Sequence, residues 1–196
     1  MIAVVKYNAG NVHSVLSGLS RIGADAILTD DADQLRTADK VIFPGVGEAS
    51  SAMAYLKSKG LDSVIKSLQK PFLGICLGMQ LMCARSEEGN SECLGIFPET
   101  VTRFPEDRGY KVPHMGWNTI KPVDDALFYN IPDESYVYFV HSYYVPESTF
   151  CTASAEYDGI SFSAALHSGN FYGVQFHPEK SGRIGEQILR NFVEVI

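Results

Sequence analysis

The chain has 196 residues, of which 45% are hydrophobic and 20% charged, and its formal net charge at pH 7 is −7. This length suits a single domain over residues 1–196 that needs no disulfide or metal to hold its core. The acidic charge argues against nucleic acid as the main partner, because a phosphate backbone requires a basic face. Apolar runs are too short for a signal peptide or a membrane span, so we expect a cytoplasmic protein with no membrane partner.

The first half of the chain alternates short β-branched runs with helical patterns, which is typical of a parallel sheet covered by helices. Apolar residues recur at helical spacing between residues 12 and 22, and Gly23 then ends the helix. A second helical pattern runs from about residue 50 to residue 69 and is interrupted at Gly60. Strands are expected over residues 2–5, 26–29, 41–43 and 72–75.

Beyond residue 95 the pattern changes to strands, with turns expected at residues 157–159 and 168–170. A last helix is expected over residues 184–195. The sequence therefore predicts an α/β fold with a mixed, mostly parallel sheet flanked by helices and with antiparallel hairpins in the second half. The strand-like runs of this half cover residues 101–104, 111–115, 136–145, 152–156, 162–167 and 171–176.

Residues 72–82 have the pattern of a nucleophile elbow built around Cys76. An apolar run is followed by Cys76 between Gly74 and Gly78, and apolar residues at helical spacing come next. A strand-to-helix turn of this kind needs small neighbours, because the nucleophile adopts a strained backbone and projects forward. A buried structural thiol is the alternative. The helix that begins at Leu77 would direct its free amides and positive dipole end at the sulfur, which favours the thiolate.

The other cysteines show no metal or disulfide pattern. No Cys-x-x-Cys spacing occurs among Cys76, Cys83, Cys93 and Cys151. We therefore expect four free thiols, without a disulfide framework, a metal site or a cofactor.

His177 is the best-placed base for a cysteine nucleophile. It follows the expected strand 171–176, and if that strand is parallel to the others, His177 emerges at the same sheet edge as Cys76. Pro178 favours an extended backbone at His177, so Glu179 should project the same way and reach the imidazole. The three residues would form a Cys-His-Glu triad, in which the carboxylate fixes the imidazole tautomer. An exposed turn before the last helix is the alternative.

An oxyanion formed at this site needs backbone donors. The amide of Leu77 is one candidate, and the loop that contains Val46 and Gly47 could supply a second, since glycine there permits a peptide flip. An ordinary strand-to-helix turn is the alternative for this loop.

Two segments together resemble class I glutamine amidotransferases of the triad type: Gly-Ile-Cys-Leu-Gly-Met-Gln at residues 74–80 and Gln-Phe-His-Pro-Glu at residues 175–179. The segments 7–11, 44–47 and 112–118 narrow the resemblance to the glutaminase subunits of imidazole glycerol phosphate synthase. The resemblance spans the whole chain and implies the flavodoxin-like fold of that class.

The resemblance also implies a function. Glutamine would be hydrolysed to glutamate and ammonia through a thioester on Cys76, and the ammonia would pass to a separate cyclase subunit in a heterodimer. That cyclase makes imidazole glycerol phosphate and aminoimidazole carboxamide ribotide in histidine biosynthesis. The substrate contacts of the family correspond to Gln80, Glu88, His141, Ser142 and Tyr143. The segments that the family places beside the cyclase contain Asn11, His114, Met115 and Trp117.

Simpler roles stay open for these segments, and different functions stay open for the chain. Asn11 could simply cap the first helix, and residues 114–117 could simply pack in the core. The chain could be the glutaminase of another synthase, for example in a pyridoxal phosphate or surface-sugar pathway. It could also be a non-catalytic regulatory module on the same fold, although the complete Cys, His and Glu set speaks against this.

Overall fold

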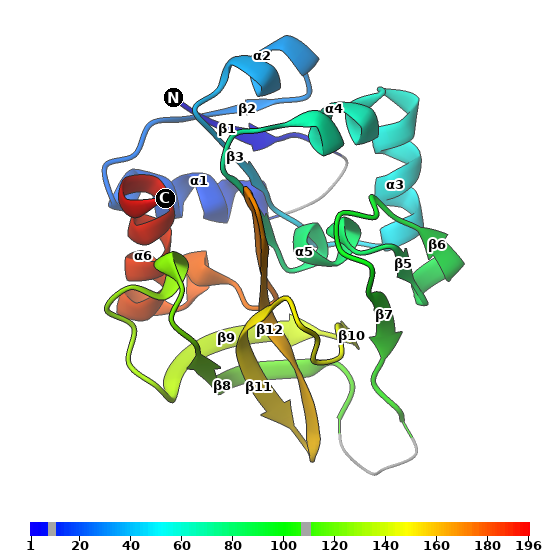
Figure 1. Ribbon diagram of the computed structural model, residues 1–196, viewed down its shortest axis with the longest axis vertical. Helices are drawn as coiled ribbons and strands as arrows, with labels where there is room; N and C mark the ends of the chain where they lie inside the picture. Colours follow the sequence, from blue (N-terminus) through cyan, green and yellow to red (C-terminus); the bar gives the residue numbers. More distant parts are fainter. Residues whose placement is uncertain (8–10, 107–110) are drawn as a thin grey trace.

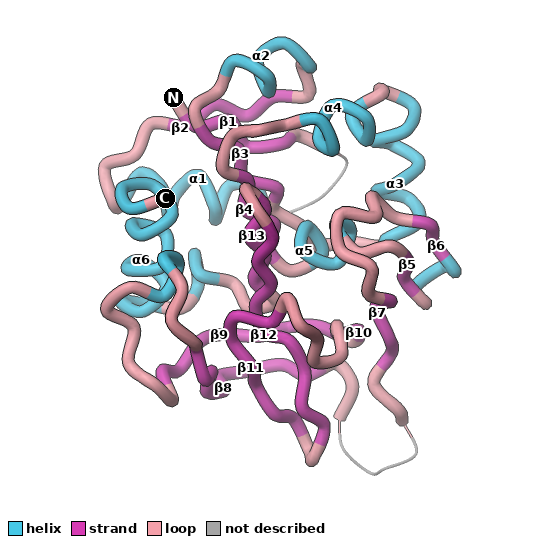
Figure 2. The backbone as a smooth tube through the Cα atoms, in the orientation of Figure 1, coloured by secondary structure: helices cyan, strands magenta, loops and turns pink. Residues whose placement is uncertain are grey.

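The computed structural model describes residues 1–7, 11–106 and 111–196. These residues form a nine-stranded sheet in the order β2-β1-β3-β4-β13-β12-β11-β8-β9 and a small four-stranded sheet in the order β10-β7-β5-β6 (Figures 1 and 2). The large sheet consists of β1 (Ile2–Val5), β2 (Ala26–Thr29), β3 (Lys40–Phe43), β4 (Phe72–Ile75), β8 (His114–Pro122), β9 (Ser135–His141), β11 (Cys151–Tyr157), β12 (Ile160–Ser168) and β13 (Phe171–Val174). The small one consists of β5 (Arg85–Ser86), β6 (Ser91–Glu92), β7 (Thr100–Arg103) and β10 (Tyr143–Tyr144).

Helices cover both faces of the parallel part of the large sheet, from β2 to β13. The strands of this part alternate their apolar side chains between two cores, as Val4 and Val5 show. One core includes α1 (Val12–Arg21) and α6 (Gly182–Arg190). The other includes α2 (Ala32–Thr37), α3 (Ala49–Ser58), α4 (Leu61–Ser67) and α5 (Leu77–Met82). Figure 1 shows α1 and α6 on one side of the central strands and α3 and α5 on the other.

From β13 to β9 the sheet is antiparallel. The hairpin between β11 and β12 turns at Asp158 and Gly159, within the expected segment 157–159, and their φ angles of 51° and 79° fit a two-residue hairpin turn. Along β8 successive side chains point to opposite faces, so His114 and Ile120 are buried while Trp117 faces outward. The prediction of a mixed sheet with antiparallel hairpins in the second half is therefore confirmed.

Several predicted boundaries were wrong. The strand expected over residues 111–115 is β8, which begins at His114 and continues to Pro122. The strand expected over residues 136–145 is broken at Ser142 into β9 and β10. Strand β13 ends at Val174, two residues before the predicted end, and α6 gives way to a π-helical turn over Asn191–Val195. Among the described residues, no helix is both long and apolar enough to cross a membrane.

Candidate active site

Cys76 occupies the turn between β4 and α5 in a strained backbone conformation, with φ 53° and ψ −110°. Its amide donates a hydrogen bond of 2.7 Å to the carbonyl of Val174, which ties the turn to β13. The flanking glycines are required by close packing. A Cβ on Gly78 would lie 1.9 Å from the carbonyl oxygen of Phe43, and one on Gly74 would lie 2.7 Å from the backbone of Gly78. The elbow therefore has the geometry that the sequence predicts.

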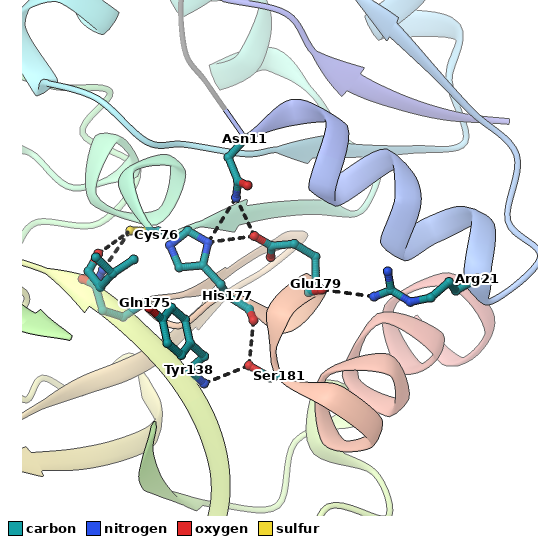
Figure 3. A network of polar contacts seen from close by, with 9 residues as sticks. Asn11, Arg21, Cys76, Tyr138, Gln175, His177, Glu179 and Ser181 are labelled. Atoms are coloured by element: carbon teal, nitrogen blue, oxygen red, sulfur yellow. Dashed lines mark hydrogen bonds and ion pairs between the residues drawn. The ribbon is translucent and has the colours of Figure 1, made fainter. Parts of the chain in front are cut away.

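The sheet brings His177 to this turn. Strand β13 is parallel to β4, with Val174 opposite Ile75, so the chain leaves both strands at the same edge. Figure 3 shows the His177 ring between Cys76 and Glu179, with one ring nitrogen directed at the sulfur. That nitrogen, Nε2, is buried and has no hydrogen-bond partner among the residues that the structure describes. It is thus free to exchange a proton with Cys76.

Glu179 completes the predicted triad. Its Oε1 lies 2.8 Å from Nδ1 of His177, and both side chains are fully buried. The sequence predicts this contact from an extended segment, but the chain instead enters a short 3₁₀ turn, Pro178–Lys180, which carries the carboxylate back to the ring. The carboxylate holds the proton of His177 on Nδ1 and leaves Nε2 for the sulfur.

Asn11 is an additional partner of the triad. Its Nδ2 donates a hydrogen bond of 2.6 Å to Oε1 of Glu179 and lies 3.5 Å from Nδ1 of His177. Asn11 precedes α1 in a left-handed conformation with φ 70°, and its side chain makes no capping hydrogen bond. The simple helix-capping role is therefore not what this side chain does. Residues 8–10 of the same motif lie outside the described residues.

The charges of the site favour an imidazolium. Burial by itself lowers the pKa of His177, but its electrostatic interactions with Cys76 and Glu179 and its hydrogen bond with Glu179 outweigh burial and raise that pKa to about 10. The imidazole of His177 thus lies between two acidic side chains, those of Cys76 and Glu179.

The backbone of His177 is fixed to β9. Its amide donates to the carbonyl of Tyr138 at 2.9 Å. Ser181 bridges the same two residues, because its hydroxyl donates to the carbonyl of His177 at 2.6 Å and accepts from the amide of Tyr138 at 2.9 Å (Figure 3). These bonds set the position of the ring before a substrate binds.

Gln175 also contacts the sulfur, and sequence analysis missed it. Its Nε2 donates to Sγ of Cys76 at 3.5 Å, and its Oε1 accepts from Nε2 of Gln80 at 2.9 Å. Gln175 precedes His177 by two residues in the short segment between β13 and the 3₁₀ turn, and both side chains lie beside the elbow (Figure 3). That spacing is a signal that could have identified it.

A pocket of about 280 Å³ opens onto the nucleophile. Its lining combines the predicted nucleophile, the expected oxyanion residues and all the expected substrate contacts, together with Pro113 and Val140. The predicted residues that line it are Val46, Gly47, Cys76, Leu77, Gln80, Glu88, His141, Ser142 and Tyr143.

One of the expected oxyanion donors, the Leu77 amide, is not free in this conformation. The amide of Leu77 donates to the carbonyl of Gly45 at 3.3 Å, so the loop itself occupies the donor that we expected to hold the oxyanion. The loop lies so close that a Cβ on Gly45 would be 2.6 Å from the amide nitrogen of Gly78 and from the hydroxyl of Tyr7. Gly47 has a φ of +135°, a conformation that favours glycine. Release of the Leu77 amide therefore requires rotation of the loop peptide.

Glu88 forms the acidic wall of the pocket. One carboxylate oxygen, Oε2, accepts a hydrogen bond of 2.8 Å from the amide of Ala49 at the start of α3. Burial raises the pKa of Glu88, the hydrogen bond lowers it, and the neighbouring Glu48 raises it further. A cation that bound here would offset both unfavourable effects.

His141 and His114 are a buried, neutral pair. They lie opposite each other on β9 and β8, with Nε2 of His141 3.0 Å from Nδ1 of His114. Nδ1 of His141 lies 2.7 Å from the carbonyl of Tyr143. Burial lowers the pKa of His141 to about 3 and that of His114 to about 4. His141 therefore contributes no positive charge to the pocket at neutral pH.

The four residues expected at a partner interface do not share one surface. The pleat of β8 places His114 on the opposite face from Met115 and Trp117. Met115 and Trp117 are 62% and 56% exposed on the outer face of β8, next to the equally exposed Tyr136 on β9. His114 is 3% exposed and faces the core, and Asn11 contacts the triad instead. Only Met115 and Trp117 of the four thus present their side chains for docking in this conformation.

Comparison with known proteins agrees with this geometry. The family model described as "Glutamine amidotransferase class-I" matches residues 3–196, so the chain is a class-I glutamine amidotransferase. A protein from Thermoplasma acidophilum that is described as a putative GMP synthase subunit has the same fold, with a TM-score of 0.75 at 22% identity over 100% of this chain and 93% of that one.

Two relatives show to which family within this class the chain belongs. The imidazole glycerol phosphate synthase subunit HisH of Bacteroides fragilis strain YCH46 is 57% identical over 99% of both chains. The HisH subunit of Pasteurella multocida is 45% identical over 100% of this chain and 98% of its own. The chain belongs to the HisH family.

Proposed function

We propose that this chain hydrolyses glutamine to glutamate and ammonia through a thioester on Cys76. The observation that carries the proposal is the buried arrangement of Cys76, His177 and Glu179 at the end of a pocket. A nucleophile, a proton carrier and an orienting carboxylate are together what amide hydrolysis by a cysteine requires.

The reaction proceeds in two steps. The thiolate of Cys76 attacks the side-chain amide carbon, a C–S bond forms, and the C–N bond breaks as His177 gives its Nε2 proton to the departing nitrogen, which leaves as ammonia. Water then attacks the thioester while Nε2 of His177 takes its proton. The C–S bond breaks, glutamate leaves, and the thiolate–imidazolium pair is restored.

Glutamine is held by the pocket in this proposal. Glu88 binds the α-ammonium group, because its carboxylate is half-buried and has one hydrogen-bonding oxygen beyond the contact with Ala49. Gln80 and the segment His141, Ser142 and Tyr143 line the remaining wall, near the α-carboxylate. Since His141 is neutral, this end of the pocket relies on hydrogen bonds.

The partner is a separate cyclase subunit, with which the chain forms a heterodimer in the cytoplasm. Relatives that are named as subunits of imidazole glycerol phosphate synthase support this proposal, which places the chain in histidine biosynthesis. The outer face of β8 and β9, with Met115, Trp117 and Tyr136, supplies an exposed apolar surface for docking. The ammonia released at Cys76 would be channelled to the cyclase.

Substitution of the nucleophile tests the hydrolysis. Cys76→Ser should lower the glutaminase rate by roughly 10⁴-fold or more and prevent labelling by an electrophilic glutamine analogue, while the melting temperature stays unchanged. Cys151→Ser is the matched control, since Cys151 is a free thiol outside the pocket, and it should keep both rate and labelling. Glutamine turnover retained by folded Cys76→Ser would refute the nucleophile.

Substitution on the outer face tests the partner. Trp117→Glu should weaken binding of the cyclase, measured by titration calorimetry, by about 2 kcal/mol or roughly 30-fold, because a charge replaces a large exposed aromatic. Leu28→Glu on β2 is the control, because β2 lies at the opposite edge of the sheet from β9 and Leu28 is 40% exposed. Equal binding by the two variants would place the docking surface elsewhere.

A further inference from the structure

We propose that Gln175 is a further catalytic residue, whose side-chain amide donates a hydrogen bond to the sulfur of Cys76 and holds it as the thiolate. The proposal rests on the hydrolysis proposed above and deepens it, because it assigns the second side chain that touches the reacting sulfur. Nε2 of Gln175 lies 3.5 Å from Sγ, and Gln175 is fully buried.

The position of Gln175 is set by the sheet. Its amide donates to the carbonyl of Ala164 at 2.8 Å, and the preceding residue, Val174, accepts the amide of Cys76 at 2.7 Å. Gln175 is therefore held on both sides, by β12 and by the elbow itself. In Figure 3 its side chain approaches the sulfur from a different direction than His177 does. The two donors can act on Sγ at once.

A chain of hydrogen bonds decides which end of the Gln175 amide faces the sulfur. The carbonyl of Tyr143 can only accept, so Gln80 must direct its Nε2 there, at 2.8 Å. The same Nε2 lies 2.9 Å from Gln175, which must therefore present its own oxygen, Oε1. The remaining end of Gln175 is the NH₂ group, and it faces Sγ. Because the orientation of both side-chain amides, Gln80 and Gln175, is fixed by these contacts, Gln175 acts as a donor toward the sulfur.

This donor acts on the charge of the sulfur. A hydrogen bond to a thiolate is stronger than one to a thiol or a thioester, because the acceptor is ionised. Gln175 thus stabilises Cys76 before attack and again when sulfur leaves the thioester in the second step. It exchanges no proton, so the acid–base work stays with His177. Gln80 acts as a positioning residue that orients Gln175.

The rate of Cys76 alkylation by iodoacetamide, followed by mass spectrometry of its peptide from pH 4 to pH 10, tests the contact. The rate follows the thiolate fraction. Gln175→Met keeps the size of the side chain but removes the donor, and it should move the midpoint up by about one pH unit, a tenfold change in the equilibrium. Gln175→Glu places an acceptor against the sulfur and should move the midpoint further up. The glutaminase rate should fall about tenfold or more in both variants.

The controls separate this contact from other effects. His177 and Tyr7 both have a charge interaction with Cys76, and both are retained in these variants. Gln69→Met, an equivalent change at an exposed glutamine, should keep the wild-type midpoint. Folded Gln175 variants that keep the wild-type midpoint and rate would overturn the proposal.

A measurement on the wild-type chain covers the case in which the variants do not fold. The side-chain ¹⁵N resonance of Gln175 should titrate with the midpoint of the alkylation curve, and this titration should disappear in Cys76→Ala. A resonance that does not respond to the titration of Cys76 would overturn the proposal. If the wild type is alkylated with a Gln175-dependent midpoint but does not hydrolyse glutamine, the proposed function is wrong and the contact stands.

Discussion

Asn11 and His177 share one oxygen of Glu179. Oε1 accepts the Asn11 amide at 2.6 Å and lies 2.8 Å from Nδ1 of His177, so a single acceptor aligns two side chains. The amide of Asn11 stabilises the carboxylate through a hydrogen bond without adding a charge of its own. This balance of hydrogen bonds orients Glu179 toward the imidazole.

A charge at position 11 should disturb this balance. Asn11→Asp places a second carboxylate against Glu179, which favours protonation of one of the two and weakens the hold on His177. We expect kcat to fall at least about tenfold further than in Asn11→Ala, measured by steady-state glutaminase assays. Asn130→Asp is the matched control, because Asn130 is exposed and has the same left-handed backbone, with φ 59°. Similar rates for Asn11→Asp and Asn11→Ala would contradict the idea.

At this scale the sequence motifs predict Cys76, His177 and Glu179, because each occurs in a short pattern with a local geometric reason. The contact of Gln175 with Cys76 and that of Asn11 with Glu179 each join residues that are far apart in the sequence. Both depend on the direction in which a side-chain amide points. No spacing rule contains that information. The packing of β13 against the elbow and of α1 against the triad supplies it.

The elbow is a property of three elements together. Helix α5 begins so close to the end of β3 that Gly78 touches the backbone of Phe43, with 1.9 Å between a Cβ at position 78 and the Phe43 oxygen. A backbone atom cannot rotate away as a side chain can. The approach of α5 to β3 therefore fixes where the helix starts and where Cys76 points.

Gly78→Ala should break this arrangement. We expect a loss of roughly 1–3 kcal/mol or more in the free energy of unfolding, measured with urea, and loss of most glutaminase activity, because α5 must move away from β3. Gly95→Ala is the comparison, since its methyl group enters open space at a φ of +68° and costs only the conformational strain of about 1 kcal/mol. If Gly78→Ala were as stable and active as the wild type, the close contact with Phe43 would not matter.

Among the elements, the buried parallel strands were the easiest to predict, because short β-branched runs between turns rarely form anything else. Helix α2 was missed, since its six residues, Ala32–Thr37, have a single buried side chain, Leu35. Its capping signal was present, because Asp31 accepts from the amides of Asp33 and Gln34. The strand β8 was predicted too early in the sequence. The exposed Trp117 obscures the alternation of buried and exposed residues, which becomes clear only from the pairing of β8 with β9.

Across the whole molecule, the buried His114 and His141 should make stability depend on pH. Unfolded imidazoles bind protons below about pH 6.5, whereas these two stay neutral until about pH 4 and about pH 3. Between pH 7 and pH 5 these two imidazoles bind more protons in the unfolded state than in the folded state. Their contribution to the free energy of unfolding therefore falls as the pH falls from 7 to 5. Urea unfolding at several pH values measures this pH dependence.

Substitution of one imidazole separates this effect from that of other groups. His114→Phe preserves the stacking on Phe139 and Tyr157 and should reduce the slope by up to about 1.4 kcal/mol per pH unit. His13→Asn, on the exposed side of α1, should keep the wild-type slope. Equal slopes for His114→Phe and the wild type would show that the buried pair does not control the pH response.

The contacts of β9 with both the exposed face and the active site constrain how the sequence of this protein can evolve. Its Tyr138 packs edge-on against the exposed Trp117 at 6.0 Å, while the carbonyl of Tyr138 holds His177, and that of Val140 lies 3.8 Å from the sulfur. Mutations that shift this strand to improve docking also displace the base and the nucleophile. In a randomised library of this surface, tight association and fast turnover should therefore trade off against each other, and variants that gain both should carry compensating changes outside β9.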